Sequence, residues 1–281
     1  MAAIALAAGV LVGAQQHTAT SAPHAVVHGP GFFARIARLG GRGPGSFAAA
    51  EKAAETAGID RTLAYTPLVR IAGAQHREIA LTFDDGPGPY TLHMLRVLRH
   101  LHAPATFFEV GIVTRDFHSA TSRLVADGYP IGDHTESHAP MSSLPAGAQE
   151  AQISQAAAAL GQYGVTYPRL FRPPYGLYNN TTLALLRKYR MLMVMWTVDT
   201  SDYTQPGVNA IVHRAVSGAR PGAIILMHDA GGPRAQTIAA VPRIVKALRA
   251  RGYKIVSVPK LLLDNPPPRD QQIGAVLAGG G

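Results

Sequence analysis

Two histidines and a pair of aspartates are the residues of this sequence whose types and spacing could hold a metal ion. His134 and His138 are separated by three residues, which lets both imidazoles face one point on a helical turn or in a tight loop. Asp84 and Asp85 are adjacent carboxylates that repel each other, so at least one of them needs a cation. Two histidines and one aspartate form a three-ligand divalent site of the catalytic type, with positions left for water. A surface histidine pair and a plain turn are the alternatives when each motif is taken alone.

Three further polar side chains could serve such a site. His228 follows four apolar residues, so we expect it at the mouth of a buried strand, where its near-neutral titration suits proton transfer to a leaving group. Arg172 is permanently charged and would hold a neighbouring carboxylate ionised and oriented, with Asp199 anchoring the guanidinium. A core histidine and a structural salt bridge are the competing interpretations of these residues.

Short apolar runs of β-type alternate with helical patterns between about Glu78 and Asp264. The predicted strands are 79–83, 105–110, 130–133, 170–173, 192–198, 223–227 and 254–258. The predicted helices are 91–102, 119–127, 148–163, 181–189, 208–217 and 237–251. Seven strands and six helices in alternation indicate parallel βα units, arranged as an open sheet or a barrel. Both architectures bind ligands at the carboxyl ends of their strands, so we expect the polar clusters that follow the strands to meet at one mouth.

The flanking segments differ from this region in composition. Residues 1–21 begin with an uncharged apolar run that is shorter than the ~20 residues of a membrane span and matches the core of a secretory signal or part of an anchor. An Ala-rich core helix is the alternative. Residues 22–77 are rich in Gly, Ala and Pro, and we expect a linker or a small N-terminal extension there. The catalytic domain is predicted over 78–264 and a flexible tail over 265–281.

Composition excludes several classes of protein. A chain of 281 residues that is 47% hydrophobic can bury a sizeable core, which excludes a disordered chain. The absence of cysteine excludes disulfides, thiolate zinc sites and cysteine nucleophiles, so only His, Asp or Glu could hold a metal. The net charge of +9 is scattered without a dense basic block, which disfavours a nucleic-acid binder and fits association with an anionic cell envelope.

Five motifs in order resemble those of the polysaccharide deacetylases, the NodB-homology domains of carbohydrate esterase family 4. They are Thr-Phe-Asp-Asp-Gly at 82–86, His-Thr-Glu-Ser-His at 134–138, Arg-Pro-Pro-Tyr at 172–175, Asp-Thr-Ser-Asp-Tyr at 199–203 and Leu-Met-His-Asp at 226–229. The resemblance covers about residues 78–258, essentially the whole organised domain. It implies an α/β fold of NodB-homology type, a deformed (β/α) barrel with fewer than eight strands, which is consistent with about seven parallel strands.

The resemblance also implies roles for the residues that match the motifs. Asp85, His134 and His138 would hold one divalent metal ion, most often zinc and sometimes cobalt. Asp84 would be the general base that activates the attacking water together with the metal, and His228 would protonate the leaving amine.

The remaining positions would orient the base and bind the substrate. Arg172 would orient Asp84 and be braced by Asp199, and the backbone N–H of Tyr175 would stabilise the oxyanion. Leu226 would line the pocket for the acetyl methyl group. Three residues would contact the sugar: Tyr175, Tyr203 and Pro173.

The sequence departs from the family pattern near the site. Tyr203 stands where the family often has tryptophan, so the aromatic wall of the groove would grip the sugar differently. Asp133 stands where asparagine is common and is expected to add negative charge near the metal. Glu136 lies between the two metal histidines and has no assigned role.

The resemblance implies a metal-dependent N-deacetylase of N-acetylglucosamine units in peptidoglycan, chitin or chitooligosaccharide, acting as a monomer. We expect an exported, basic protein of this kind to act on peptidoglycan or another envelope glycan. An O-acetyl esterase on xylan or a similar glycan would use the same chemistry on a different bond. A non-catalytic glycan-binding module is an alternative of another class, and retention of Asp84, Asp85, both metal histidines and His228 argues against it.

Overall fold

The structure, a computed structural model, describes residues 44–271. The apolar segment predicted at 1–21, the first part of 22–77 and the end of the predicted tail lie outside the described residues. Within residues 44–271, no helix combines the length and the apolar character that a membrane span requires.

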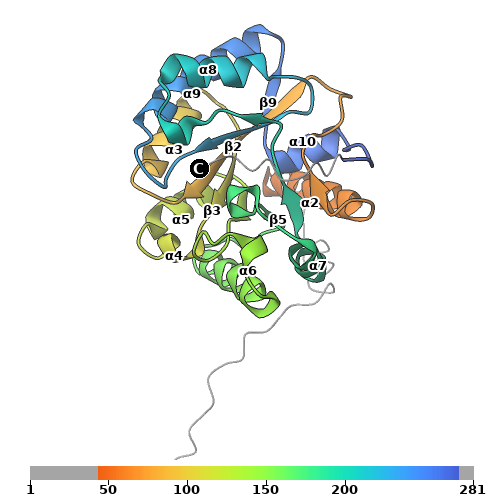
Figure 1. Ribbon diagram of the computed structural model, residues 1–281. Coiled ribbons are helices and arrows are strands. Elements are labelled where there is room, and N and C mark those ends of the chain that lie inside the picture. Colours follow the sequence, from red (N-terminus) through yellow and green to blue (C-terminus); the bar gives the residue numbers. More distant parts are fainter. Residues whose placement is uncertain (1–43, 272–281) are drawn as a thin grey trace, which may run out of the picture. The chain divides into compact units, whose positions relative to one another are not determined.

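Nine parallel strands form one curled sheet within the described residues, and helices pack around it (Figure 1). The strands are β1 (Leu68–Val69), β2 (Glu78–Gly86), β3 (Thr106–Glu109), β4 (Ile131–Asp133), β5 (Leu170–Phe171), β6 (Leu192–Val194), β7 (Val198–Asp199), β8 (Ile224–His228) and β9 (Lys254–Val256). The α-helices are α2 (Pro44–Leu63), α3 (Thr91–His100), α4 (Gly111–Thr114), α5 (His118–Ala126), α6 (Ala146–Gly161), α7 (Asn180–Lys188), α8 (Val208–Ser217), α9 (Ala235–Ala250) and α10 (Val258–Asp264). Single 3₁₀ turns lie at η1 (Met141–Ser143), η2 (Pro174–Gly176) and η3 (Asp202–Thr204).

The strand order confirms the predicted deformed barrel. Along the sheet the order is β1-β6-β5-β4-β3-β2-β8-β7, and β9 pairs with β2. The seven predicted runs all contain strands, but the run at 192–198 is two strands, which are the second and the last in this order. Its middle residues change partners: the N–H of Met195 donates to Val69 O (2.8 Å), whereas that of Thr197 donates to Ile224 O (3.0 Å). This change of partner connects the two ends of the curled sheet.

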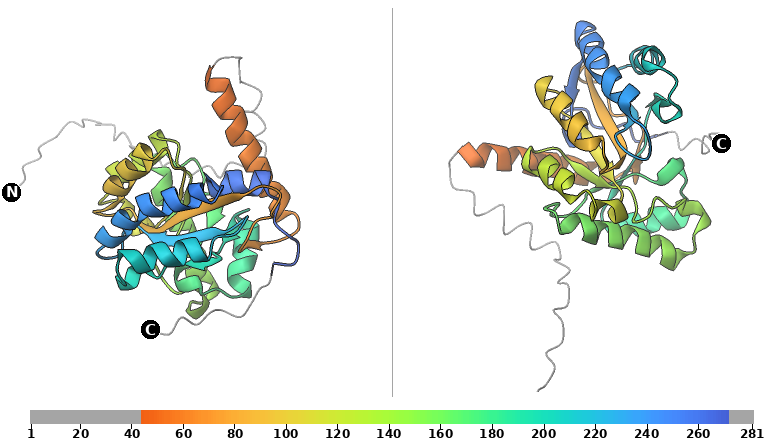
Figure 2. Two further views of the ribbon diagram at one scale, coloured as in Figure 1. Left: turned by 90° about the horizontal axis from the view of Figure 1, so that it is seen from above. Right: turned by 90° about the vertical axis from the view of Figure 1, so that its left-hand side faces the viewer.

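Residues 44–77 pack on the predicted domain as a small N-terminal extension, one of the two possibilities given above, and the first part of the predicted tail is packed as well. Residues 44–77 belong to the fold, because β1 pairs with β6 and α2, which extends from the barrel in Figure 2, contacts α10. Arg61 on α2 donates to the backbone oxygen of Leu263 at 3.0 Å. The predicted tail is also packed in its first part, since Asn265 is fully buried and the side chain of Gln271 accepts the N–H of Arg70 at 2.8 Å.

The central strand β2 carries the motif at 82–86 and lies in the core. It pairs with β3, β8 and β9, and all but one of its residues are buried. Burial on both faces explains why its sequence is a continuous apolar run rather than an alternating one. Phe83 stacks on Phe107 of β3, with ring centroids 5.3 Å apart. The carboxyl end of β2 is thereby held rigidly where the polar residues begin.

We expect Leu81→Ala to lower the free energy of unfolding by about 2–5 kcal/mol, because it deletes a fully buried side chain from β2. Leu92→Ala is the matched control, since Leu92 is 42% exposed and its truncation should change stability by no more than about 0.5 kcal/mol. Denaturant titration followed by circular dichroism measures both values. Equal losses in the two variants would contradict the position of β2 in the core.

Candidate active site

The polar clusters predicted at the strand ends converge on one mouth of the barrel. Asp84 is the register partner of His228 on the neighbouring strand β8, so the first and the last motif lie side by side. Asp133 of β4 is in register with Phe171 of β5, which brings the histidine motif beside the arginine motif. All pairs are parallel, so the five motifs meet at the carboxyl ends of the strands.

The adjacent carboxylates of Asp84 and Asp85 both face the same histidine. Successive side chains of a strand normally point to opposite faces. The strand has an irregularity between Phe83 and Gly86, and Asp85 takes a left-handed φ of 71° there. As a result the Nε2 atom of His134 lies 3.9 Å from Oδ2 of Asp84 and 3.6 Å from Oδ1 of Asp85.

Asp85, His134 and His138 form a cluster of three metal-type donors whose ligand atoms all lie within 4.8 Å of one another. The two histidines come from a tight loop rather than a helical turn, and His138 has a left-handed φ of 57°. Nδ1 of His134 donates to the backbone oxygen of Arg172 at 2.7 Å, which leaves its Nε2 lone pair facing Asp85. The ring orientation of this ligand is therefore fixed by the neighbouring strand.

The donor spacing fits a divalent ion such as zinc. Bonds of about 2.1 Å in a tetrahedral zinc site put neighbouring ligand atoms about 3.4 Å apart. Oδ1 of Asp85 is 3.1 Å from Nε2 of His138 and 3.6 Å from Nε2 of His134. Burial by itself would raise the pKa of Asp85, but the neighbouring imidazoles of His134 and His138 and the charge of His228 lower it well below its usual range. The carboxylate is thus in the ionised form that a metal ligand needs.

Arg172 is fully buried and forms an ion pair with Asp84. Its Nη1 donates to Oδ1 of Asp84 at 2.6 Å and to the hydroxyl of Thr82 at 2.8 Å. Its Nε donates to the backbone oxygen of Val194 at 2.9 Å, and its guanidinium lies over the ring of Phe108, 4.1 Å from the centroid. A buried pair of this kind keeps the carboxylate in one orientation, with Oδ2 toward the metal cluster.

The structure corrects the predicted role of Asp199. No ion pair or hydrogen bond joins Asp199 to Arg172 among residues 44–271. Oδ1 of Asp199 instead accepts the N–H of Ser201 at 2.6 Å. Ser201 has a left-handed φ of 50°, so the carboxylate stabilises the turn that leads into η3. Backbone carbonyls of residues 194 and 195 occupy the place on the guanidinium that we expected Asp199 to take.

Asp202, which the sequence analysis left without a role, orients His228. Its Oδ1 accepts Nδ1–H of His228 at 2.8 Å, and its Oδ2 accepts the backbone N–H of His228 at 2.9 Å and the hydroxyl of Thr237 at 2.7 Å. Nε2 of His228 is therefore the ring nitrogen left to meet a substrate. The signal in the sequence was the second aspartate of the 199–203 motif, because a general-acid histidine needs a carboxylate to hold its tautomer.

The environment of His228 favours its charged form. Burial by itself would lower its pKa, but the hydrogen bond and the charge of Asp202, with Asp85 and Asp84 nearby, raise the pKa to about 9. Asp202 is itself buried, which opposes ionisation, yet its bonds to His228 lower its pKa. The pair is thus a proton donor that is loaded at neutral pH.

The residues predicted to contact the substrate differ in how much of each side chain is exposed to solvent. Tyr175 is 62% exposed, and its ring meets that of His138 edge-on, with centroids 4.7 Å apart. Tyr203 is 49% exposed and meets His228 in the same way at 5.4 Å. Leu226 is buried two residues before His228 on β8, on the same face of the strand. Pro173 is buried, and its backbone oxygen accepts the N–H of Gly176, so it shapes the turn and offers a sugar little surface.

The backbone at Tyr175 matches the expected oxyanion donor. Tyr175 has a left-handed φ of 59° in η2, and within residues 44–271 its N–H donates to no protein acceptor. A strained backbone with a free donor beside the metal cluster is typical of an active site.

Asp133 and Glu136, which lie beside the histidine pair, stabilise the loop and do not add negative charge next to the metal cluster. Oδ1 of Asp133 accepts the N–H of Thr135 at 2.7 Å. Burial raises the pKa of Asp133 well above its usual value, and the charge of Glu136 adds to this, so the negative charge that we expected is not supported. Glu136 pairs with Arg115 at 2.7 Å, and its N–H donates to Gln152 O at 2.9 Å, which ties the loop to α4 and α6.

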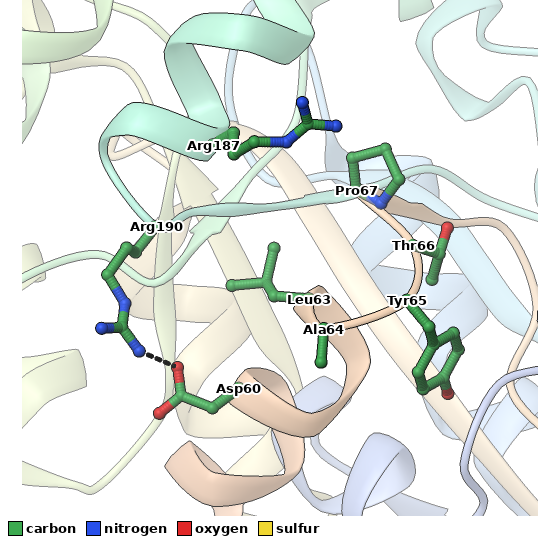
Figure 3. A pocket seen from close by; sticks show the side chains of 8 residues that line it. All are labelled: Asp60, Leu63, Ala64, Tyr65, Thr66, Pro67, Arg187 and Arg190. Carbon is green, nitrogen blue, oxygen red and sulfur yellow. Dashed lines mark hydrogen bonds and ion pairs between the residues drawn. The ribbon is translucent and has the colours of Figure 1, made fainter.

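A separate hollow of about 570 Å³ lies between the end of α2 and α7, and Figure 3 shows its lining. Asp60 forms ion pairs there with Arg190 (3.1 Å) and Arg169 (2.5 Å). None of the strand-end residues described above lines this hollow, so it is distinct from the candidate active site.

Comparison with known proteins agrees with the fold and the motifs. Residues 72–194 match the family model of polysaccharide deacetylase. The chain is 34% identical over 212 residues to a chitooligosaccharide deacetylase of Sinorhizobium fredii, which covers 71% of this chain and 99% of the relative.

Solved structures are also similar to this chain. The Bc1960 peptidoglycan N-acetylglucosamine deacetylase is similar with a TM-score of 0.68 at 28% identity, over 69% of this chain and 92% of that one. A family 4 carbohydrate esterase pseudoenzyme of Bacillus anthracis, BA3943, has a TM-score of 0.66 at 25% identity, over 70% and 69% of the two chains. With the fold, the order of the motifs and these matches in agreement, this chain belongs to the polysaccharide deacetylase family.

Proposed function

We propose that this protein hydrolyses the N-acetyl groups of N-acetylglucosamine units in a polysaccharide, with one divalent metal ion held by Asp85, His134 and His138. The observation that carries the proposal is the convergence of a base, a metal cluster and a proton donor at one mouth. Asp84 faces the cluster while Arg172 holds its other oxygen at 2.6 Å, and His228 enters from the neighbouring strand with its Nδ1 occupied by Asp202. Amide hydrolysis needs these groups together.

The residues divide the reaction between them. A divalent ion, when bound, polarises the acetyl carbonyl and lowers the pKa of water. Asp84 takes a proton from the attacking water, and Arg172 keeps this carboxylate oriented. The N–H of Tyr175 stabilises the negative charge that develops on the carbonyl oxygen. His228 then donates the proton of Nε2 to the leaving nitrogen, and Asp202 stabilises the imidazolium before the transfer.

Zinc is the ion that we propose for the site, and cobalt would be accepted by the same donors. Two imidazole nitrogens and one carboxylate oxygen are typical of catalytic zinc sites, and the chain has no cysteine that could supply a different set.

The exposed apolar side chains support a glycan substrate. The exposed large hydrophobic residues of the described chain are Leu92, Ile112, Tyr175 and Tyr203. Each belongs to the helix or turn that directly follows a strand: α3 after β2, α4 after β3, η2 after β5 and η3 after β7. Apolar side chains set singly around a polar mouth suit sugar rings, which have apolar faces and hydroxylated edges.

We further propose that the substrate lies in the cell envelope, with peptidoglycan preferred. The apolar segment within residues 1–21 has the length of a secretory signal core, and the net charge of +9 would favour contact with an anionic wall. The relatives named above act on chitooligosaccharide and on peptidoglycan, which share N-acetylglucosamine as the acetylated unit.

Metal removal and Asp84→Asn should each abolish acetate release from an N-acetylglucosamine oligomer. Chelation removes the ion that polarises the carbonyl, and added zinc should restore the rate. The asparagine cannot accept the proton of water, so kcat should fall by about 10²–10⁴-fold. Asp60→Asn is the matched control because Asp60 lies in the separate hollow, and this variant should keep its activity. Full activity in metal-free protein would contradict the proposed mechanism.

His228→Ala should impair amide hydrolysis far more than hydrolysis of an aryl acetate. An amine leaves poorly without a proton, whereas a phenolate leaves readily, so kcat/KM should fall by about 10²–10⁴-fold for the amide and much less for the ester. The exposed His213 gives the control His213→Ala, which should leave both rates unchanged. An equal loss on the two substrates would argue against proton donation, and turnover of acetylated xylan alone would favour an esterase.

Asp202→Asn should move the alkaline limb of the pH–rate profile to lower pH. The raised pKa of His228, about 9, means that the proton donor is loaded below that pH and is lost as the pH rises through it. Without the Asp202 charge, burial lowers the pKa of His228, so activity should fail at a lower pH. Asp199→Asn should leave the limb in place, since Asp199 bonds to Ser201. A limb that does not move in Asp202→Asn would refute the assignment.

A further inference from the structure

The loop that follows β8 brings a second buried arginine to the metal cluster. Arg234 is only 3% exposed and lies outside the five motifs. Its Nε donates to Ala230 O at 2.6 Å and its Nη1 to Pro233 O at 3.1 Å. Its remaining amino group, Nη2, lies 3.8 Å from Oδ2 of Asp85. The loop therefore holds the guanidinium with its own carbonyls and leaves one end toward the metal ligand.

The two oxygens of Asp85 face different partners. Oδ1 lies 3.6 Å and 3.1 Å from the Nε2 atoms of His134 and His138, where the metal is proposed. Oδ2 faces Arg234 at 3.8 Å, a distance for charge attraction or for one bridging water. The carboxylate is thus presented to the metal cluster through one oxygen.

The same loop closes the space beside Oδ2. Gly231 has a left-handed φ of 71°, and a Cβ placed on it would lie 2.3 Å from Oδ2 of Asp85. The backbone passes so close to this oxygen that only glycine fits. The loop backbone thus lies on one side of Oδ2, and the guanidinium of Arg234 attracts the same oxygen.

Each ionised acid of the mouth then has its own cation. Asp84 pairs with Arg172 at 2.6 Å, and Asp202 pairs with His228 at 2.8 Å. Asp85 has Arg234 on the side away from the histidines. Buried charges need such partners, and carboxylates that bind metal ions are commonly held by a second group whose loss weakens the site.

We propose that Arg234 is a positioning residue that holds Asp85 as a one-oxygen ligand of the metal ion. The proposal rests on the metal site of the proposed function and adds to it a residue from outside the three ligands. Loss of the guanidinium would free Oδ2 to turn, so the carboxylate would bind the ion less tightly and in a changed geometry.

Zinc affinity provides the test, because it is measured without substrate turnover. Arg234→Met keeps much of the apolar stem and removes the charge, and Arg234→Lys keeps the charge and loses the planar fork. Competition of the metal-free full chain with a chromophoric chelator should show zinc binding weakened by about 10–100-fold in Arg234→Met and by less in Arg234→Lys. The visible spectrum of the cobalt-loaded protein should change in Arg234→Met. Arg243→Met, on an exposed position of α9, is the matched control and should behave as wild type.

Wild-type zinc affinity and an unchanged cobalt spectrum in folded Arg234→Met would overturn the proposal. If the methionine variant fails to fold, Arg234→Lys decides in the same assay: weaker zinc binding supports the proposal, and wild-type values overturn it. A wild-type chain that binds zinc but releases no acetate would refute the proposed function. The zinc affinities of the Arg234 variants would still test the role of Arg234. A wild-type chain that binds neither zinc nor cobalt would refute both the proposed function and the proposed role of Arg234.

Discussion

The buried ion pair of Arg172 with Asp84 is the interaction on which the rest of the site depends. The guanidinium is completely buried, which costs free energy unless each of its donors is used. It is satisfied by the base, by the hydroxyl of Thr82 and by backbone oxygens of residues 194 and 195. The backbone oxygen of Arg172 also accepts Nδ1–H of His134 at 2.7 Å. One residue therefore contacts Asp84, His134 and the segment between β6 and β7.

This arrangement explains why the predicted strand at 192–198 is broken. A continuous strand would use the carbonyls of residues 194 and 195 in a ladder with a neighbour. They point to the guanidinium instead, and the chain leaves β6 to form β7 against β8. The motif that carries Asp199 and Asp202 follows directly, so the same break brings Asp202 to His228. The break between β6 and β7 thus lies against the buried guanidinium, and the motif that holds Asp202 begins directly after it.

Periodicity and composition predicted much of the fold, because the βα units have long apolar helical faces and buried strands. All seven predicted runs and all six predicted helices contain the expected type of element. The two-residue strand β1 was missed, since so short a run has no period, and the sequence left open whether residues 22–77 are a linker or an extension. The packing of the first part of the predicted tail was missed because it is held by single side chains such as Gln271, which leave no pattern in the sequence.

The sequence predicted those parts of the site whose chemistry follows from residue type. It did not predict the parts that depend on backbone geometry. The spacing of His134 and His138 and the adjacent carboxylates predicted two histidines and one aspartate, the family resemblance named Asp85 as that aspartate, and the structure brings the three together. Asp199 was expected to contact Arg172 and Asp202 had no assigned role, because the sequence does not show that Asp199 turns to Ser201 and Asp202 to His228. The directions of side chains in the site depend on left-handed φ angles, and the residue types at these positions do not predict them. The residues are Asp85, Thr135, His138, Tyr175 and Ser201.

Catalysis in this family depends on the groups at the mouth rather than on the barrel itself. The similar structure BA3943, a pseudoenzyme, has a TM-score of 0.66 with this chain, so a shared fold carries no activity by itself. What argues for activity here is that each group has the partner its task requires. The base is held by a cation, one metal histidine by a backbone carbonyl and the acid by a carboxylate. A binding module would have no need to hold a half-buried carboxylate and two imidazoles at the spacing of a metal site.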